Sequence, residues 1–162
     1  MSDNLKHIAL NGTADYISAL DTLCTLAQHN LFIFEKDFNN LGFNSEARYN
    51  SLRNLLLANP YNRLHLLAHN TRPLTQYCPR LLILLGQFSH NMHIYQTPRH
   101  LQHLSDPFAI ADEIHYIRRF NFEDPRGILA ENDAEGARTL KSRFDEMWAA
   151  SHAAVSATTL GL

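Results

Sequence analysis

Leu31-Phe32-Ile33-Phe34 is a continuous apolar run bounded by polar segments. Its short length and aromatic content predict a buried strand, because strands covered on both faces read as unbroken apolar runs. The next strands are expected at residues 63–68 and at Met92-His93-Ile94-Tyr95. The connections between these strands are helical in spacing and too long for hairpins, which is typical of parallel βαβ units. The first half of the chain therefore predicts a parallel sheet.

The segments that flank these strands carry apolar residues at intervals of three and four, which predicts helices with one face on the sheet. The helices are expected over residues 17–27 with Thr13 as N-cap, over residues 45–58 ended by Asn59-Pro60, and over residues 74–88 with Tyr77, Leu81, Leu84, Leu85 and Phe88 facing inward. Cys24 and Cys78 fall on helical faces without CxxC spacing, so we expect both thiols to be reduced and to serve core packing rather than catalysis.

The second half of the chain changes from long connections to short polar ones. Strand-like runs are predicted at residues 108–111, 114–120 and 127–130. Connections this short join antiparallel strands. The sheet is therefore expected to be mixed, parallel in its first half and antiparallel in its second.

The chain is predicted to close with a long amphipathic helix. This helix is expected to run from Asp133 or Ala134 to about Ala154, with Asn132 or Asp133 as its N-cap. No repeat, low-complexity stretch or linker marks a second unit. The sequence thus predicts a single α/β domain over residues 1–162, with helices flanking the mixed sheet.

Composition and charge exclude several classes of protein. Hydrophobic residues make up 45% of the chain, enough for one packed core. The 14 basic and 16 acidic residues leave a net charge of -2, so nucleic acid is not expected as a partner. No apolar run reaches the roughly 18 residues that a membrane span needs. The polar start, residues 1–7, does not resemble a secretory signal, and we expect a cytoplasmic protein without a membrane association.

The order of these elements resembles one half of a phospholipase D-like fold. The resemblance includes the segment at residues 144–151, in the last predicted helix, which is capped at Asn132-Asp133. The chain is similar to a bacterial family of such half-domains over residues 8–162. Active superfamily members carry a His-x-Lys-x4-Asp signature, whose histidine attacks phosphorus and whose lysine binds phosphate oxygens. If residues 108–112 hold the signature's strand, Ser105 replaces the histidine, Pro107 replaces the lysine, and only Asp112 remains. We therefore expect the usual phosphodiesterase chemistry to be absent, with no catalytic residue in place.

The superfamily's Gly-Ser-x-Asn turn would fall on Arg119-Phe120-Asn121-Phe122, where bulky side chains replace small ones. The resemblance implies that the neighbouring strands surround a phosphate pocket. The anion-binding candidates that it implies are Asp112, His115, Arg118, Arg119 and Asn132. Successive strand residues face opposite sides, so only one of the two arginines can enter such a pocket. A plain ion pair at the strand end is the alternative interpretation.

Ten histidines raise the question of a metal site. The closely spaced pairs are His65 with His69, His90 with His93, and His100 with His103. Zinc sites need three or four ligands, and no HExxH or cysteine pair accompanies these histidines. We therefore expect neither a metal nor a cofactor.

The leading hypothesis is a non-catalytic phospholipase D-like binding or interaction module that retains an anion or phosphate site. The alternative is a phosphodiesterase or transferase with rewired chemistry, in which His115, His100 or His103 acts beside an arginine. The resemblance also implies a homodimer, because two such halves pack face to face in phospholipase D-like enzymes. It further implies an acyltransferase as a partner, since similar domains follow acyltransferase domains in longer chains.

Overall fold

The computed structural model describes residues 5–155. Residues 1–4 and 156–162 lie outside this range, and the C-terminal end of the sequence resemblance falls on the second of these segments. The elements in chain order are β1 (Lys6–Asn11), α1 (Thr13–Leu26), β2 (Asn30–Glu35), α2 (Glu46–Ala58), β3 (Arg63–Ala68), α3 (Arg72–Tyr77), α4 (Pro79–Gln87), β4 (Met92–Gln96), the 3-10 helix η1 (Arg99–Leu101), β5 (Phe108–Ala111), β6 (His115–Asn121), β7 (Asp124–Glu131), α5 (Ala134–Ala150) and β8 (His152–Val155). Among residues 5–155, no helix has the length and apolar character needed to cross a membrane.

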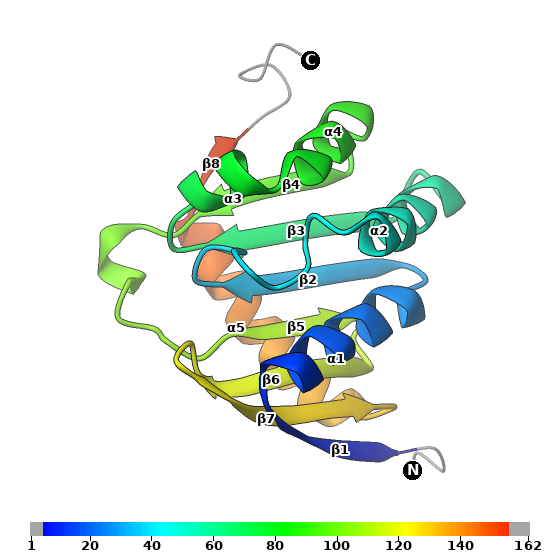
Figure 1. Cartoon of the computed structure of the whole chain (residues 1–162), viewed down its shortest axis with the longest axis vertical. Helices are drawn as coiled ribbons and strands as arrows, with labels where there is room; N and C mark the ends of the chain where they lie inside the picture. The colour runs from blue at the N-terminus through cyan, green and yellow to red at the C-terminus, as the bar shows by residue number, and fades with distance from the viewer. Residues whose placement is uncertain (1–4, 156–162) are drawn as a thin grey trace.

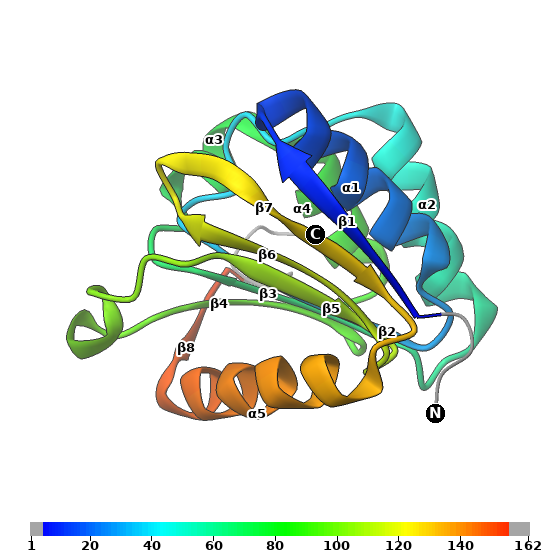
Figure 2. The same ribbon diagram turned by 90° about the horizontal axis from the view of Figure 1, so that it is seen from below.

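The strands form one eight-stranded sheet in the order β1-β7-β6-β5-β2-β3-β4-β8. The pairs β2·β3 and β3·β4 are parallel, and every other neighbouring pair is antiparallel. Figure 1 shows α1 to α4 in front of the sheet and α5 behind it, and Figure 2 shows the two helical layers on opposite faces. The predicted α/β architecture, a mixed sheet flanked by helices, is confirmed.

The side chains of β2 divide between the two cores. Leu31 and Ile33 belong to the larger apolar cluster beneath α1, α2 and α4, while Phe32 and Phe34 belong to the cluster under α5. All four are at most 2% exposed. The strand is therefore buried on both faces, and this is why its sequence is an unbroken apolar run.

The helix predicted over residues 74–88 is instead two helices, α3 and α4, which meet at Cys78. Pro79 occupies the first position of α4, where its missing N–H costs nothing, and its ring disfavours helical backbone at Cys78. The break leaves Tyr77 59% exposed, so the prediction that it faces inward is wrong. The other four residues predicted to face inward in this segment are buried.

Two of the helices begin at a residue whose side chain caps the free N–H groups of the first turn. Ser45 accepts a hydrogen bond from the N–H of Arg48 at the start of α2, and Asp133 accepts one from Gly136 at the start of α5. Asp133 is one of the two caps predicted for that helix. At α1, Gly12 holds the cap position and Thr13 is already helical, so the predicted Thr13 cap is wrong.

The two outer strands of the sheet were not predicted. β1 pairs with β7, and β8 pairs with β4. α5 stops at Ala150, before the predicted end near residue 154, because Ser151 is extended and leads directly into β8. Of the residues in β1, only Leu10 is buried, so its sequence lacks the strong apolar pattern of an inner strand.

Candidate functional site

A cleft of about 320 Å³ opens where β2 and β6 end. Figure 1 shows the ends of both strands on its left side. The charged side chains that line it are Glu35, Lys36 and Asp37 from the end of β2, Arg119 from β6, and Glu123 from the β6–β7 turn. The carboxyl ends of parallel strands are where open α/β sheets commonly bind ligands. This cleft is the candidate functional site.

Glu35, Arg119 and Tyr16 form a buried polar cluster in the wall of the cleft. Glu35 is 1% exposed and Arg119 is 7% exposed. Arg119 Nη2 donates to Glu35 Oε1 at 3.3 Å, the Tyr16 hydroxyl donates to Glu35 Oε2, and Arg119 Cζ lies 4.1 Å from the centre of the Tyr16 ring. The three side chains come from β2, β6 and α1, which meet only in the folded chain.

Burial raises the pKa of Glu35 to about 7, although Arg119 and the Tyr16 hydroxyl act in the opposite direction. Burial, and then the charge of Glu35, raise the pKa of Tyr16 well above its usual value. Glu35 can therefore exchange a proton near neutral pH, while Tyr16 stays a hydrogen-bond donor. A carboxyl group with such a pKa, next to a cation and a cleft, marks a candidate site on physical grounds.

Arg119 uses little of its hydrogen-bonding capacity. A guanidinium carries five N–H donors. Besides the bond to Glu35, Nη1 makes a long 3.5 Å contact with the carbonyl oxygen of Phe122. Nε is buried and finds no partner among the described residues. The cleft is thus lined by an arginine that can still donate to an acceptor.

His69 lies beside the same edge of the sheet but has no free nitrogen. Its Nε2 lies 2.6 Å from the carbonyl oxygen of Leu104, so Nε2 carries the hydrogen and Nδ1 accepts from the Thr97 hydroxyl at 2.6 Å. Gln102 Nε2 donates to the same Thr97 oxygen at 3.0 Å. Burial lowers the pKa of His69. The residue holds the connection between β4 and β5 in place.

Ser105 and Pro107, where the resemblance would place the histidine and lysine of the signature, are both bonded to the end of β6. The Ser105 hydroxyl accepts from Asn121 Nδ2 at 3.0 Å. The Ser105 carbonyl oxygen accepts from Phe122 N at 2.8 Å, and that of Pro107 accepts from Arg119 N at 3.1 Å. The Ser105 hydroxyl is thus held against Asn121, and Pro107 carries no charge.

The five anion-binding candidates from the sequence do not share one pocket. Asp112, His115 and Asn132 lie at the opposite end of β5 and β6 from Arg119. Three backbone N–H groups at residues 28–30 donate to the Asp112 carboxylate, and His115 Nδ1 accepts from the N–H of Asn132. Arg119 is four residues along β6 from His115, which is about 13 Å at the usual rise per residue of a strand.

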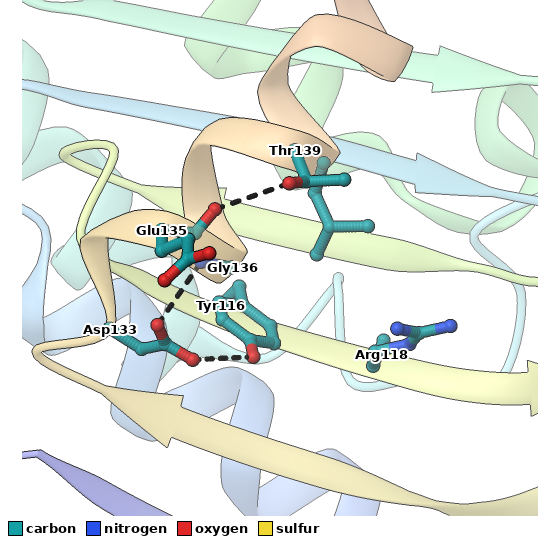
Figure 3. A pocket seen from close by; sticks show the side chains of 7 residues that line it. Tyr116, Arg118, Asp133, Glu135, Gly136 and Thr139 are labelled. Carbon is teal, nitrogen blue, oxygen red and sulfur yellow. Dashed lines mark hydrogen bonds between the residues drawn. The ribbon is translucent and has the colours of Figure 1, made fainter.

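Arg118 and Arg119 face opposite sides of the sheet, since Arg118 is exposed and Arg119 is buried. Arg118 lines a second pocket of about 370 Å³ at the start of α5, together with Tyr116, Asp133 and Glu135. Figure 3 shows Asp133 bonded to the Tyr116 hydroxyl and to Gly136 N, with Arg118 standing apart. Hydrogen bonds from Gly136 and Tyr116 lower the pKa of Asp133, so this pocket keeps its negative charge.

The histidine pairs do not assemble into a metal centre within residues 5–155, where no group of three or more His, Cys, Asp or Glu side chains could hold an ion. His65 and His93 do meet, with ring centres 5.4 Å apart, and the His65 ring stacks on Trp148 of α5. Glu35 and Tyr16 were not among the residues predicted from the sequence. Glu35 could have been recognised from the sequence, because it directly follows the apolar Leu31-Phe32-Ile33-Phe34 run and therefore lies in a strand that is covered on both faces.

Several solved structures share this fold. TrmBL2, an archaeal chromatin protein described as showing a novel mode of DNA binding, aligns with a TM-score of 0.67 at 12% identity over 91% of this chain and 54% of its own. Nuc from Salmonella typhimurium, a phospholipase D family member, aligns with a TM-score of 0.67 at 10% identity over 94% of this chain and 100% of its own. NucT from Helicobacter pylori aligns with a TM-score of 0.61 at 12% identity, over 93% and 99% of the two chains.

These identities are low, so the likeness establishes the fold alone: the chain has a phospholipase D-like α/β fold. It spans only about half of the chromatin protein. A search of curated proteins finds no match. Residues 13–160 match the family described as Domain of unknown function (DUF7931), and the chain belongs to that family.

Proposed function

We propose that this chain is a non-catalytic phospholipase D-like domain that binds a small oxyanion through Arg119, in the cleft at the end of β2. One observation carries the proposal: a buried guanidinium with unfilled N–H donors lines the cleft, and no histidine or cysteine is among the described residues that line it. Arginine is well suited to the planar oxygens of carboxylate and phosphate groups. The cleft therefore has the means to bind an oxyanion without a nucleophile of the kind that attacks phosphorus in the resembled enzymes.

The charges of the two pockets favour Arg119 over Arg118 as the anion ligand. The pocket beside Arg118 contains two acids, Asp133 and Glu135, and Asp133 stays ionised because its pKa is lowered. The cleft beside Arg119 contains a second cation, Lys36, next to the acids Glu35, Asp37 and Glu123, and Glu35 can become neutral near pH 7. Once Glu35 is neutral, the two cations balance the two remaining acids, and an anion meets less repulsion there than in the Arg118 pocket.

A sulfate titration tests the binding part of the proposal. We expect saturable binding of sulfate at about pH 6, where most of Glu35 is protonated, followed by calorimetry or by amide chemical shifts. Arg119→Gln should abolish the binding, whereas Arg118→Gln, on the opposite face of the sheet, should leave it unchanged. Binding that survives Arg119→Gln, or no binding at all, would overturn the proposal.

A separate assay tests the absence of catalysis. Bis(4-nitrophenyl) phosphate should release no nitrophenol above the uncatalysed rate, because Ser105 and Pro107 replace the nucleophile and the cation of the signature. Turnover that is lost when His115, His100 or His103 is changed to glutamine would instead support the rewired enzyme.

The expected partners follow from the same interpretation. The net charge of -2 argues against nucleic acid. The DNA binding of the archaeal chromatin protein is a property of that protein, which is 12% identical to this chain. A homodimer, an acyltransferase partner and a cytoplasmic location remain predictions from the resemblance and the composition.

A further inference from the structure

The cleft beside Arg119 has room for an ion together with its water. Its volume of about 320 Å³ corresponds to roughly ten water molecules at ~30 Å³ each. The cleft contacts the cluster of Glu35, Arg119 and Tyr16 described above, whose side chains are almost fully buried. An ion that enters the cleft therefore meets both a guanidinium and a carboxyl group.

The guanidinium and the carboxyl group are only loosely paired. The distance between Arg119 Nη2 and Glu35 Oε1 is 3.3 Å. A charge-assisted hydrogen bond between a guanidinium and a carboxylate is usually shorter, at about 2.7–2.9 Å. The second Arg119 contact, to the Phe122 carbonyl oxygen, is longer still at 3.5 Å. The buried Nε has no partner among the described residues. An oxyanion could form better bonds to Arg119 than Glu35 does.

An incoming anion is repelled by Glu35 as long as this group is ionised. Three acids line the cleft, Glu35, Asp37 and Glu123, against the two cations Lys36 and Arg119, which gives a net charge of -1. Lys36 lies 3.7 Å from Glu123 in an exposed ion pair. Protonation of Glu35 alone brings the balance to zero.

Glu35 can be protonated without leaving the cluster. The Tyr16 hydroxyl donates to Glu35 Oε2, and Arg119 donates to Oε1. A neutral carboxyl group keeps an acceptor oxygen for Tyr16 and gains an O–H that can itself donate, because a protonated carboxyl is both donor and acceptor. The change therefore needs no rearrangement of the fold.

We propose that Glu35 and Arg119 form a proton-coupled oxyanion site, in which the anion binds when Glu35 is protonated, so that binding at a pH where Glu35 is ionised takes up one proton on Glu35. This inference rests on the proposed function, because it assigns a regulation to the same cleft. Anion affinity is then set by pH: it is high when Glu35 is neutral and low when Glu35 is charged.

Sulfate is the probe, because it keeps its double negative charge between about pH 5.5 and pH 8.5, so that only the protein titrates. The affinity of the full chain should be highest at the acid end and fall toward a limit of about tenfold per pH unit above the titration of Glu35. Calorimetry at about pH 8 in two buffers of different ionisation enthalpy should report close to one proton taken up per sulfate.

Glu35→Gln is the decisive variant, since it fixes a neutral, nearly isosteric side chain beside Arg119. It should bind sulfate with the same affinity across the whole range and without proton uptake. Asp37→Asn is the matched control, because it neutralises a neighbouring acid and should leave the pH dependence in place. Circular dichroism and the melting temperature of each variant show whether it is folded before its binding is interpreted.

The outcomes separate this inference from the function on which it rests. One outcome is sulfate binding that depends on Arg119 and yet shows the same affinity at every pH and no proton uptake. That result would overturn the coupling between anion binding and protonation of Glu35 and leave the proposed function standing. A sulfate affinity that still changes with pH in Glu35→Gln would also overturn the coupling and leave the proposed function standing. A complete lack of sulfate binding at about pH 5.5 would overturn the proposed function itself.

Discussion

Asp112 Oδ1 accepts a hydrogen bond from the backbone N–H of His29 at 2.7 Å, and the two residues are 83 positions apart in the sequence. The same carboxylate accepts from the N–H groups of Gln28 at 2.9 Å and Asn30 at 3.0 Å. Asp112 stands in the turn between β5 and β6 with a positive φ of 56°. Asp112 thus fastens that turn to the start of β2.

Removal of this carboxylate should cost stability. Asp112→Ala leaves three N–H groups without their acceptor, and hydrogen bonds to a charged group contribute about 1.5–3 kcal/mol each when buried. Because Asp112 is partly exposed, we expect a total loss of about 2–4 kcal/mol in the free energy of unfolding by urea. Glu113→Ala, at the next and exposed position of the same turn, should change it by less than about 0.5 kcal/mol. Equal effects of the two variants would refute this role of Asp112.

Gly127 should not tolerate a side chain. A Cβ atom at this position would stand 2.1 Å from the carbonyl oxygen of Arg118, which is backbone and cannot move aside without opening the β6·β7 pairing. Gly127→Ala should therefore lower the free energy of unfolding by more than about 2 kcal/mol. Gly12→Ala is the control, because a Cβ there meets nothing within 4 Å. A melting temperature for Gly127→Ala that equals that of the control would show the prediction to be wrong.

Acid should destabilise the fold through His65. The ring stacks on Trp148 with centres 4.3 Å apart. Burial, followed by the charges of His93, Arg63 and Lys141, lowers its pKa from 6.5 to about 3. Between these two values the unfolded chain binds a proton at this position more readily than the folded chain, so the contribution of neutral His65 to stability is full above pH 6.5 and is lost as the pH decreases toward 3.

His65→Phe keeps an aromatic ring against Trp148 but removes the titrating group. The decline of the urea midpoint between about pH 6.5 and pH 4 should be shallower in this variant than in the parent chain. His29→Gln changes an exposed histidine and should preserve the parent slope. A decline that is identical in all three proteins would rule out His65 as its source.

The homodimer implied by the resemblance is open to a direct measurement. Light scattering coupled to size exclusion should give about 37 kDa at micromolar concentration, which is twice the 18.5 kDa of one chain. A constant 18.5 kDa species at every concentration would contradict the predicted dimer.

The fold class could be predicted from the sequence because it depends on local patterns. The unbroken Leu31-Phe32-Ile33-Phe34 run reports burial on two faces, and the short connections after residue 111 report antiparallel pairing. The outer strands β1 and β8 could not be found in this way. Their residues are largely exposed, and pairing with β7 and β4, rather than any local pattern, makes them strands.

The candidate site divides in the same manner. The sequence by itself determined that Arg118 and Arg119 face opposite sides and that Asp133 can cap α5, since each follows from residue type and spacing. Only the tertiary structure decided that Arg119 meets Glu35, 84 residues away, and that Asp112 lies at the far end of the strands. Strand order and register determine which distant residues come into contact. Both depend on long-range packing, which no local sequence pattern specifies.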